Sequence, residues 1–464
     1  MPRLLTIVIA AAVAALLALP AAASAKTFTK TFRYGPITVA GYEVKQTEAD
    51  FDAPEPDFDG YVTGMSVDVV DKQGNQVPIS RLMLHHIVFH NFGPKLGAKR
   101  DQTCSRFTML NSTTVIPAVS ERFYGAGEER QKLVLPPGYG YRTTKQDNWT
   151  LTWMLMNHRA VTDSAYIQYK VTLTDDPATT PVTPYWADVE NCYTDPQFTV
   201  PGGGEPGSRF TKQVTWTAPR DMRIVAAGGH VHGGAYDVTL RQPQCQDRSL
   251  ITSVPAWGTA KHPFYNVKPV LHEPGPIFMT RTLSASGFPV AKGEQLQLTT
   301  SYDAQLPHTR AMGIMVFYAA DAKEPPQPCS PLPTDVVTQR TTQPHRESPP
   351  RFTVPLTGLN RKGQAIKIAA PPGTRVQAAD NALVRIKDFQ FSRTNLKLPV
   401  GARLSWRFDD DQLHDVTLAS GPRGFASTHL SNRRTFTQEF DTPGTYKVFC
   451  SLHPVRMTQT IEVG

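Results

Sequence analysis

Side chains that often bind metal ions gather near the C-terminus of this 464-residue chain. Cys450, His453 and Met457 lie close together, and His414 lies upstream of them. A thiolate, two imidazoles and a distant thioether form the ligand set of a blue copper electron-transfer site, in which soft sulfur ligands suit Cu(I). Each of these residues alone is more often a buried core residue, but the four together favour the metal. We therefore predict a type 1 copper site at His414, Cys450, His453 and Met457.

Two pairs of histidines form a second set of candidate ligands. His230 and His232 are two residues apart, so on a β-strand both imidazoles project from one face and can share an ion. His85 and His86 are adjacent and share an ion only where the strand twists or bulges. Either pair alone would by default consist of surface histidines. The case for a metal therefore depends on other residues in the chain.

The elements that must position these residues are predicted to be β-strands. Short runs rich in Val, Ile, Thr and aromatic residues, such as 60–70, 165–173 and 312–318, are separated by turn residues. No stretch of three helical turns shows a convincing apolar stripe. Hydrophobic residues make up 40% of the chain and charged residues 19%, which is a globular balance. We therefore predict an all-β protein built from sandwiches or barrels.

The length of the chain and its prolines predict several domains of about 100 to 200 residues each. Pro occurs 40 times and is concentrated between residues 323 and 355, which indicates a semi-rigid linker. We predict sandwiches over residues 26–185 and 186–322, a Pro-rich linker over 323–380 and a separate domain over 381–464. A linker raises the effective concentration of the last domain, so we expect electron delivery within one chain.

Residues 1–25 are predicted to be a signal peptide. Arg3 precedes an apolar run that ends in small residues, with an Ala-x-Ala cleavage site before Lys26. The run is too short for a membrane anchor, so we expect a secreted protein, either extracellular or periplasmic. The formal net charge of +8 is spread along the chain without a basic block, so we expect no nucleic acid partner.

The five cysteines cannot all pair within one chain. If Cys450 is the free one, Cys104, Cys192, Cys245 and Cys329 suit up to two disulfides in an oxidising compartment. The sequence leaves all three possible pairings of these four residues open.

Residues 383–464 resemble cupredoxins of the plastocyanin and amicyanin type, on the pattern of His414, Cys450, His453 and Met457. The resemblance implies a Greek-key β-sandwich with one type 1 copper. The gap between His453 and Met457 lies between the gaps of the two named families, so the loop shape and the redox potential stay open.

The upstream histidines, taken in order with His158 and Met312, resemble the copper type II ascorbate-dependent monooxygenases, the family of peptidylglycine α-hydroxylating monooxygenase and dopamine β-monooxygenase. Residues 122–127 and 135–142 follow the same family pattern, and the resemblance covers about residues 60–320. It implies two tandem jelly-roll-like β-sandwiches followed by the cupredoxin sandwich. It also implies two type 2-like coppers. His85, His86 and His158 would hold the electron-storing copper, and His230, His232 and Met312 the catalytic copper.

The expected function is that of a copper-dependent monooxygenase that hydroxylates a C–H bond with O2. Its partners would be a small-molecule or peptide substrate and an external reductant, either ascorbate-like or a redox protein. Residues 226–229 are small where the peptide enzyme has an arginine, and Val316 replaces its tyrosine, so the resemblance does not extend to a peptidylglycine substrate. One alternative is a non-catalytic copper-binding or electron-transfer protein that keeps the scaffold. Another treats the upstream histidines as incidental and predicts one copper per chain.

Overall fold

The computed structural model describes residues 26–109 and 115–464. The predicted signal peptide lies outside these residues. Nearly all of the regular structure in the described part is β-strand, and the single helix there is the four-residue α1 (Pro263–Asn266). The prediction of an all-β fold is confirmed. Among the described residues, no helix has the length and apolar character that crossing a membrane would require.

A ten-stranded sheet runs through the first two thirds of the chain. Its strands, in spatial order, are β1 (Thr27–Val39), β11 (Asp163–Thr174), β3 (Gly60–Val70), β9 (Tyr139–Thr143), β12 (Thr180–Asp188), β23 (Gly313–Asp321), β15 (Met222–Val231), β20 (Arg281–Val290) and β24 (Val337–Gln339), with β8 (Leu133–Val134) beside β3.

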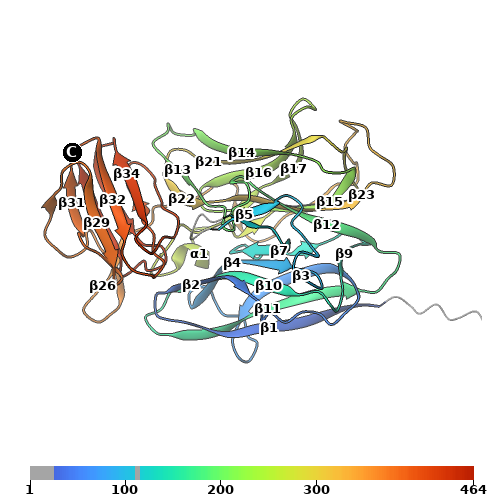
Figure 1. Ribbon diagram of the computed structural model, residues 1–464, viewed down its shortest axis with the longest axis horizontal. Coiled ribbons are helices and arrows are strands. Elements are labelled where there is room, and N and C mark those ends of the chain that lie inside the picture. The colour runs from blue at the N-terminus through green and yellow to red at the C-terminus, as the bar shows by residue number, and fades with distance from the viewer. Residues whose placement is uncertain (1–25, 110–114) are drawn as a thin grey trace, which may run out of the picture.

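Two four-stranded sheets pack against this large sheet. The first contains β2 (Val44–Asp50), β10 (Trp149–Asn157), β4 (Leu82–Asn91) and β7 (Glu121–Gly127), and the second contains β14 (Arg209–Thr217), β21 (Gln295–Asp303), β16 (Ala235–Gln242) and β17 (Arg248–Ser253). Phe89, Leu151 and Ile167 are fully buried in the first core, and Leu298 and Phe317 in the second. Two layered units therefore lie one above the other (Figure 1).

The predicted boundary between residues 185 and 186 falls inside β12. This strand pairs in parallel with β9, where Thr180 lies opposite Tyr139, and antiparallel with β23, where Thr183 lies opposite Ala319. The two units thus share one continuous sheet, and the domain boundary stays a prediction.

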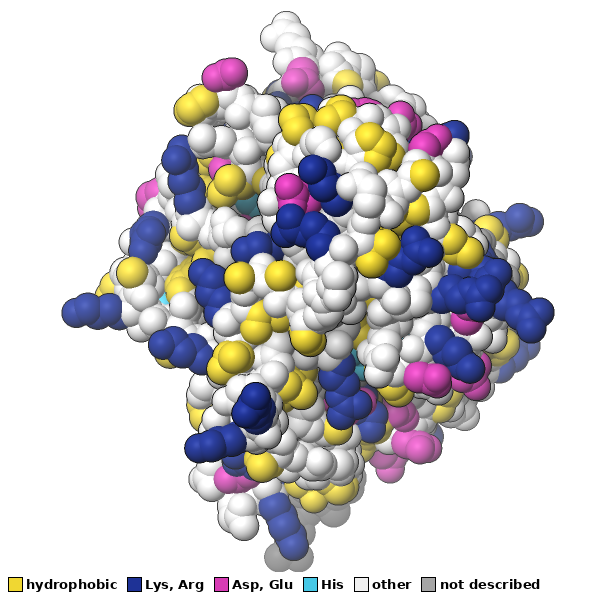
Figure 2. All heavy atoms as spheres, turned by 90° about the vertical axis from the view of Figure 1, so that its left-hand side faces the viewer, with side chains coloured by type: hydrophobic (Ala, Val, Ile, Leu, Met, Phe, Trp, Pro, Cys, Tyr) yellow, Lys and Arg dark blue, Asp and Glu magenta, His cyan; other side chains and the backbone are white. Residues whose placement is uncertain are grey.

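The C-terminal unit is a separate sandwich that stands beside the other two (Figure 1). One sheet contains β28 (Val376–Gln377), β31 (Asn395–Leu398), β36 (Thr458–Val463), β35 (Gly444–Phe449) and β33 (Thr417–Ser420), and the other contains β30 (Gln390–Phe391), β29 (Ala382–Lys387), β32 (Ala402–Phe408) and β34 (Thr435–Phe440). In β32 every second residue is buried, with Leu404, Trp406 and Phe408 in the core. This period of two is what a strand with one buried face requires. On the face drawn in Figure 2, Lys and Arg side chains are dispersed among uncharged ones.

The Pro-rich segment 323–380 is held against the body of the protein for part of its length. β24 pairs with β20 at the edge of the large sheet, and β25 (His345–Arg346) pairs with β18 (Pro255–Gly258). Short paired segments complete the fold: β5 (Arg106–Thr108) with β6 (Val115–Pro117), β13 (Phe198–Val200) with β22 (His308–Ala311), β19 (Phe278–Met279) with β18, and β26 (Thr357–Leu359) with β27 (Ala365–Lys367).

The disulfides settle the cysteine pairing. Cys104 bonds Cys192 and Cys245 bonds Cys329, while Cys450 is free and buried. The prediction of up to two disulfides with Cys450 left over is confirmed. The second disulfide fastens the start of the Pro-rich segment to the turn after β16.

The C-terminal sandwich is docked onto the rest of the chain. Its hydrophobic core is continuous with Val44, Met83 and Met154 of the first unit. Leu452 contributes to this shared core and accepts a backbone hydrogen bond from Val44 through its carbonyl oxygen, at 3.4 Å. The loop that carries the predicted copper ligands is therefore also an interface.

Candidate copper sites

The four predicted ligands of the C-terminal site come from two segments. β35 and β36 are antiparallel neighbours, so the loop between Phe449 and Thr458 must turn back on itself. The N–H of Cys450 donates to the carbonyl oxygen of Met457 (3.0 Å), and the N–H of His453 donates to the carbonyl oxygen of Cys450 (3.1 Å). These bonds close the loop and hold the backbone of Cys450, His453 and Met457 together, and the Met457 side chain is buried.

Three ligand atoms of this site converge. His414, Cys450 and His453 each offer an atom within 4.8 Å of the others. The two Nδ1 atoms of His414 and His453 lie 3.2 Å apart, and the Cys450 sulfur lies 3.6 Å from His453 Nδ1. His414 Nε2 lies 3.3 Å from Asp410 Oδ1, which favours a proton on Nε2 and leaves Nδ1 free as a ligand. This donor set fits copper.

Burial keeps this site free of positive charge. It lowers the pKa of His453 to about 4, an effect to which His414 adds, and it lowers the pKa of His414. Burial also raises the pKa of the Cys450 thiol, and the nearby Asp415 raises it further. Neutral imidazoles are the metal-binding form. A bound metal cation would instead favour the deprotonated thiolate of Cys450.

A β-bulge brings the adjacent histidines together. In the pairing of β4 with β10, His86 lies opposite Met154 but Leu84 lies opposite Leu155, so His85 is the extra residue of the bulge. The two Nδ1 atoms of His85 and His86 lie 3.3 Å apart. Adjacent histidines can share an ion only where their strand twists or bulges, and β4 has such a bulge at His85.

The second pair also lies together, at the end of β15. The ring centroids of His230 and His232 are 5.1 Å apart. His230 Nδ1 lies 3.2 Å from a carboxylate oxygen of Glu129, and His232 Nδ1 lies 2.5 Å from the carbonyl oxygen of Arg310. Both Nε2 atoms are buried without a hydrogen-bond partner among the described residues. The contacts on Nδ1 fix tautomers that leave these Nε2 lone pairs available to a metal.

The histidines of the two units meet in one cluster. The ring of His85 lies 5.2 Å from that of His232 and 5.0 Å from that of His272, measured between centroids. His85, Glu128 and His272 form a group whose ligand atoms lie within 4.8 Å of one another. His272 and Glu128 are hydrogen-bonded to each other. Sequence reasoning missed both residues, because they belong to irregular segments with no ligand spacing.

His158 and Met312 lie on different sides of this cluster. His158 Nδ1 lies 3.3 Å from the carbonyl oxygen of Pro269, and its Nε2 is buried without a partner in the described structure. Burial, with a smaller contribution from His272, lowers the pKa of His158 to about 4. Met312 is buried, and its N–H donates to the hydroxyl of Tyr302 (3.1 Å).

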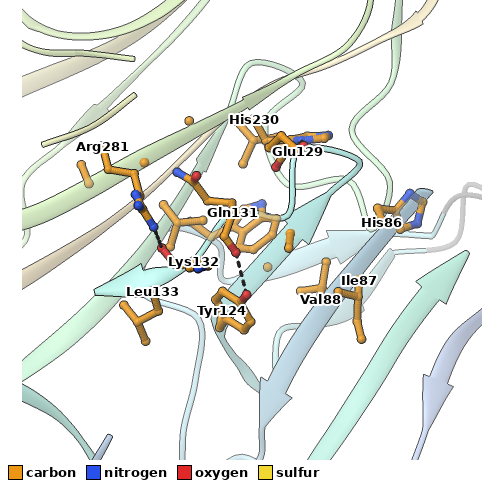
Figure 3. A pocket seen from close by; sticks show the side chains of 18 of the residues that line it. His86, Ile87, Val88, Tyr124, Glu129, Gln131, Lys132, Leu133, His230 and Arg281 are labelled. Carbon is orange, nitrogen blue, oxygen red and sulfur yellow. Dashed lines mark hydrogen bonds and ion pairs between the residues drawn. The ribbon is translucent and has the colours of Figure 1, made fainter. Parts of the chain in front are cut away.

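Two cavities divide these residues differently from the predicted trios. His86, His230 and Met312 line a mostly apolar cavity of about 860 Å³, its open mouth included (Figure 3). His85, His232 and His272 line a second cavity of about 640 Å³, which His429 and Ser451 of the C-terminal sandwich also line. Each cavity thus receives histidines from both units, although the Nδ1 atoms of His85 and His86 lie only 3.3 Å apart. The assignment of each copper to a separate trio stays a prediction.

Burial and neighbouring charges shift the pKa values of the cluster in different directions. Burial and then neighbouring His230 lower the pKa of His86 to about 4 and that of His232 to about 3. Burial would raise the pKa values of Glu128 and Glu129, but His272 and His230 respectively outweigh it and lower them. Glu129 outweighs burial at His230 and raises the pKa of that imidazole, so a metal ion bound there would have to displace its proton.

Comparisons with known proteins point to the same metal. No protein-family model matches the chain. It is 25% identical over 240 residues to the protein named probable copper-dependent oxygenase clz3 of Cochliobolus lunatus, covering 48% of this chain and 64% of that protein. It is also 25% identical over 271 residues to probable copper-dependent oxygenase M1 of a Phoma species, covering 54% and 59%. The chain thus spans about three fifths of the length of these relatives.

A further relative is similar to a shorter part of the chain. Amicyanin-alpha of Methylorubrum extorquens is 25% identical over 93 residues, which cover 19% of this chain and 78% of amicyanin. Among solved structures, an oxidised amicyanin variant covers 18% of this chain and 82% of its own at 20% identity, with a TM-score of 0.17. The chain is copper oxygenase-like and has a cupredoxin-like part. Copper is the metal named for both oxygenases.

Proposed function

We propose that this protein is a copper-dependent monooxygenase of the peptidylglycine and dopamine monooxygenase type, with a fused blue copper part that supplies electrons. One atom of O2 would enter a substrate C–H bond and the other would leave as water, with two electrons and two protons from an ascorbate-like reductant or a redox protein. The observation that carries the proposal is the convergence of His85, His86, His230 and His232 beside an apolar cavity that also contains Met312.

We assign the metals as follows. A type 1 copper is held by His414, Cys450, His453 and Met457. Two type 2-like coppers are held in the histidine cluster, with His85, His86 and His158 as ligands of one and His230, His232 and Met312 as ligands of the other. His272 and Glu128 are additional candidate ligands on the side of His85. Bound copper would supply the one-electron chemistry and the activation of O2.

The chain's own residues prepare this site in two ways. Glu129 and the carbonyl oxygen of Arg310 hold the imidazoles of His230 and His232 with Nε2 facing the cluster. Val88, Trp186 and Ile314 give the cavity beside them an apolar wall. Such a wall excludes water from the reacting C–H bond and suits a substrate with an apolar reacting end.

A continuous path of contacts links the cupredoxin-like part to the histidine cluster. His232 Nδ1 contacts the carbonyl oxygen of Arg310 (2.5 Å), and Arg310 Nη2 lies 3.2 Å from Asp415 Oδ1. The N–H of Asp415 in turn donates to the Cys450 sulfur (3.4 Å). The predicted tether is thus supplemented by docking. The path supports electron delivery within the chain, although it meets the cluster at His232 and not at the predicted electron-storing trio.

Metal analysis of the purified protein tests the copper assignment first, and three coppers per chain are expected. Cys450→Ser should remove the blue colour and leave the other two bound. One copper per chain would instead support the alternative in which the upstream histidines are incidental.

Oxygen uptake tests the activity. Copper-loaded protein with ascorbate and a panel of hydroxylatable substrates should consume O2 and form hydroxylated product. Met312→Ile is the matched control, because it removes the thioether and keeps an apolar side chain of similar size. Three bound coppers with no uptake above that of Met312→Ile would favour the non-catalytic electron-transfer alternative.

A further inference from the structure

The cavity beside His86 and His230 has a mostly apolar lining that also includes Glu129 and Asp195, and Gln131 and Arg281 lie at one end of it (Figure 3). Both polar atoms of the Gln131 side chain are buried, and neither has a hydrogen-bond partner among the described residues. A buried amide without partners costs about 1–3 kcal/mol for each unsatisfied group. Because this amide is buried in the cavity wall, a ligand can satisfy it when the Gln131 side chain turns toward the cavity.

The backbone around Gln131 is built to admit this side chain. A Cβ atom placed on Gly228 would lie 2.1 Å from Gln131 Nε2, so any larger residue there would displace the amide from its present position. Gly228 belongs to the small run 226–229, which the sequence analysis singled out because it lacks the arginine of the peptide enzyme. The main-chain carbonyl of Gln131 accepts a hydrogen bond from the hydroxyl of Tyr124 (2.6 Å), which fixes the backbone beneath the side chain.

The neighbouring cation is partly engaged. Arg281 Nη1 donates to the carbonyl oxygen of Lys132 (3.2 Å), and its Nε is buried without a partner in the described structure. The unpartnered buried atoms at this end of the cavity therefore carry three N–H groups, two on Gln131 Nε2 and one on Arg281 Nε, and one carbonyl acceptor, Gln131 Oε1. A carboxylate offers acceptors only, whereas a carboxamide offers an acceptor and a donor and can pair with both atoms of the Gln131 amide.

We propose that this cavity binds a mostly apolar substrate that carries one carboxamide group, which pairs with the side-chain amide of Gln131 while an apolar C–H region lies beside His86, His230 and Met312. A mostly apolar lining with a few polar groups is the kind of site that binds small organic molecules. This inference deepens the proposed oxygenase function and rests on it for the identity of the reacting end.

The test is a binding measurement on the full chain, without reductant, by isothermal titration calorimetry. The probes are 3-phenylpropanamide, 3-phenylpropanoate and propylbenzene, which share one apolar body and differ in the polar group. We expect the amide to bind about tenfold to a hundredfold more tightly than the hydrocarbon, as two restored hydrogen bonds imply. Gln131→Leu should abolish this preference and retain binding of propylbenzene.

Two further variants separate loss of the Gln131 amide from misfolding, and a carboxamide substrate from a carboxylate. Gly228→Ala retains Gln131 but displaces its amide, so it should reduce the amide preference even if Gln131→Leu folds poorly. A preference for 3-phenylpropanoate that is lost in Arg281→Met and kept in Gln131→Leu would overturn the proposal in favour of a carboxylate substrate. Equal binding of the three probes, or no binding, would also overturn it. Because no turnover is needed, a protein without oxygenase activity can still show the amide preference, and an active oxygenase can still lack it.

Discussion

Replacing Arg310 by Met should loosen the docking of the C-terminal sandwich. The Arg310 side chain is 15% exposed and that of Asp415 is fully buried, and the two are 3.2 Å apart. Arg310 also donates to the Thr417 hydroxyl (3.0 Å) and the Ser427 carbonyl (3.2 Å) of the same sandwich. Arg310→Met therefore removes the cation from a buried carboxylate and several hydrogen bonds across one interface.

The magnitude follows from what remains around Asp415. Removing one partner of a buried ion pair typically costs about 3–5 kcal/mol. Asp415 keeps hydrogen bonds from the N–H of Ser451 (3.0 Å) and from the Thr417 hydroxyl (2.6 Å), and His429 Nε2 lies 3.5 Å away. These contacts hold part of the charge, so we expect the low end of that range, about 3 kcal/mol.

The assay is chemical denaturation followed by two probes. Blue absorbance reports the C-terminal sandwich and far-ultraviolet circular dichroism reports the whole chain. In Arg310→Met the blue transition should move to lower denaturant concentration, and electron transfer from the blue copper to the histidine cluster should slow. Arg310→Lys should lie between, because it keeps the charge and loses the forked geometry.

The control is Arg241→Met. Arg241 lies 3.5 Å from Asp247, and the side chain of Asp247 is 64% exposed, so its loss should cost about 0–1 kcal/mol. If Arg310→Met changes the blue transition and the electron-transfer rate no more than Arg241→Met does, the contact path does not couple the C-terminal sandwich to the histidine cluster, and the reasoning fails.

Three further changes test separate steps. Burial raises the pKa of Glu121 to about 7 from an ordinary value of 4.5. The free energy of unfolding should therefore fall by up to about 3 kcal/mol as the pH rises from about 4.5 to 7. When this free energy is measured by urea denaturation at each pH, Glu121→Gln should remove that fall. His272→Ala should lower the copper content of the histidine cluster and leave the blue absorbance unchanged; unaltered metal analysis would exclude His272 as a ligand. Gly127→Ala places a Cβ 2.4 Å from His230 Cε1, so it should also weaken copper binding there, whereas normal affinity would mean that the ring can move aside.

The features that sequence predicted well are those set by local spacing. Alternating apolar and polar residues predicted β32, and the short interval from Cys450 to Met457 predicted a loop of candidate ligands between two strands. Adjacency of His85 and His86 required a bulge, and the register of β4 against β10 contains one. In each case the physical cause lies within a few residues of the pattern, so the pattern sufficed.

The features that sequence missed depend on how separate elements pack. His272 reaches His85 only because the loop after α1 crosses from the second unit to the first. Glu128 enters the same cluster from the end of β7. No spacing connects residues so far apart in the chain. The two cavities mix the predicted trios for the same reason, since each is lined by residues of both units.

Docking gives the unusual ligand loop a second role. The interval between His453 and Met457 departs from both named cupredoxin patterns, and this same stretch holds Val455, which is buried in the core that the C-terminal sandwich shares with Val44 and Met83. A loop that must cover its metal site and also fill an interface is constrained in length by both tasks. Arg310 adds to this constraint, because its left-handed backbone (φ 56°) directs its carbonyl toward His232 while its side chain reaches Asp415. The loop spacing and the contact path are therefore best understood together, as two consequences of fixing a cupredoxin-like sandwich against a copper oxygenase-like body.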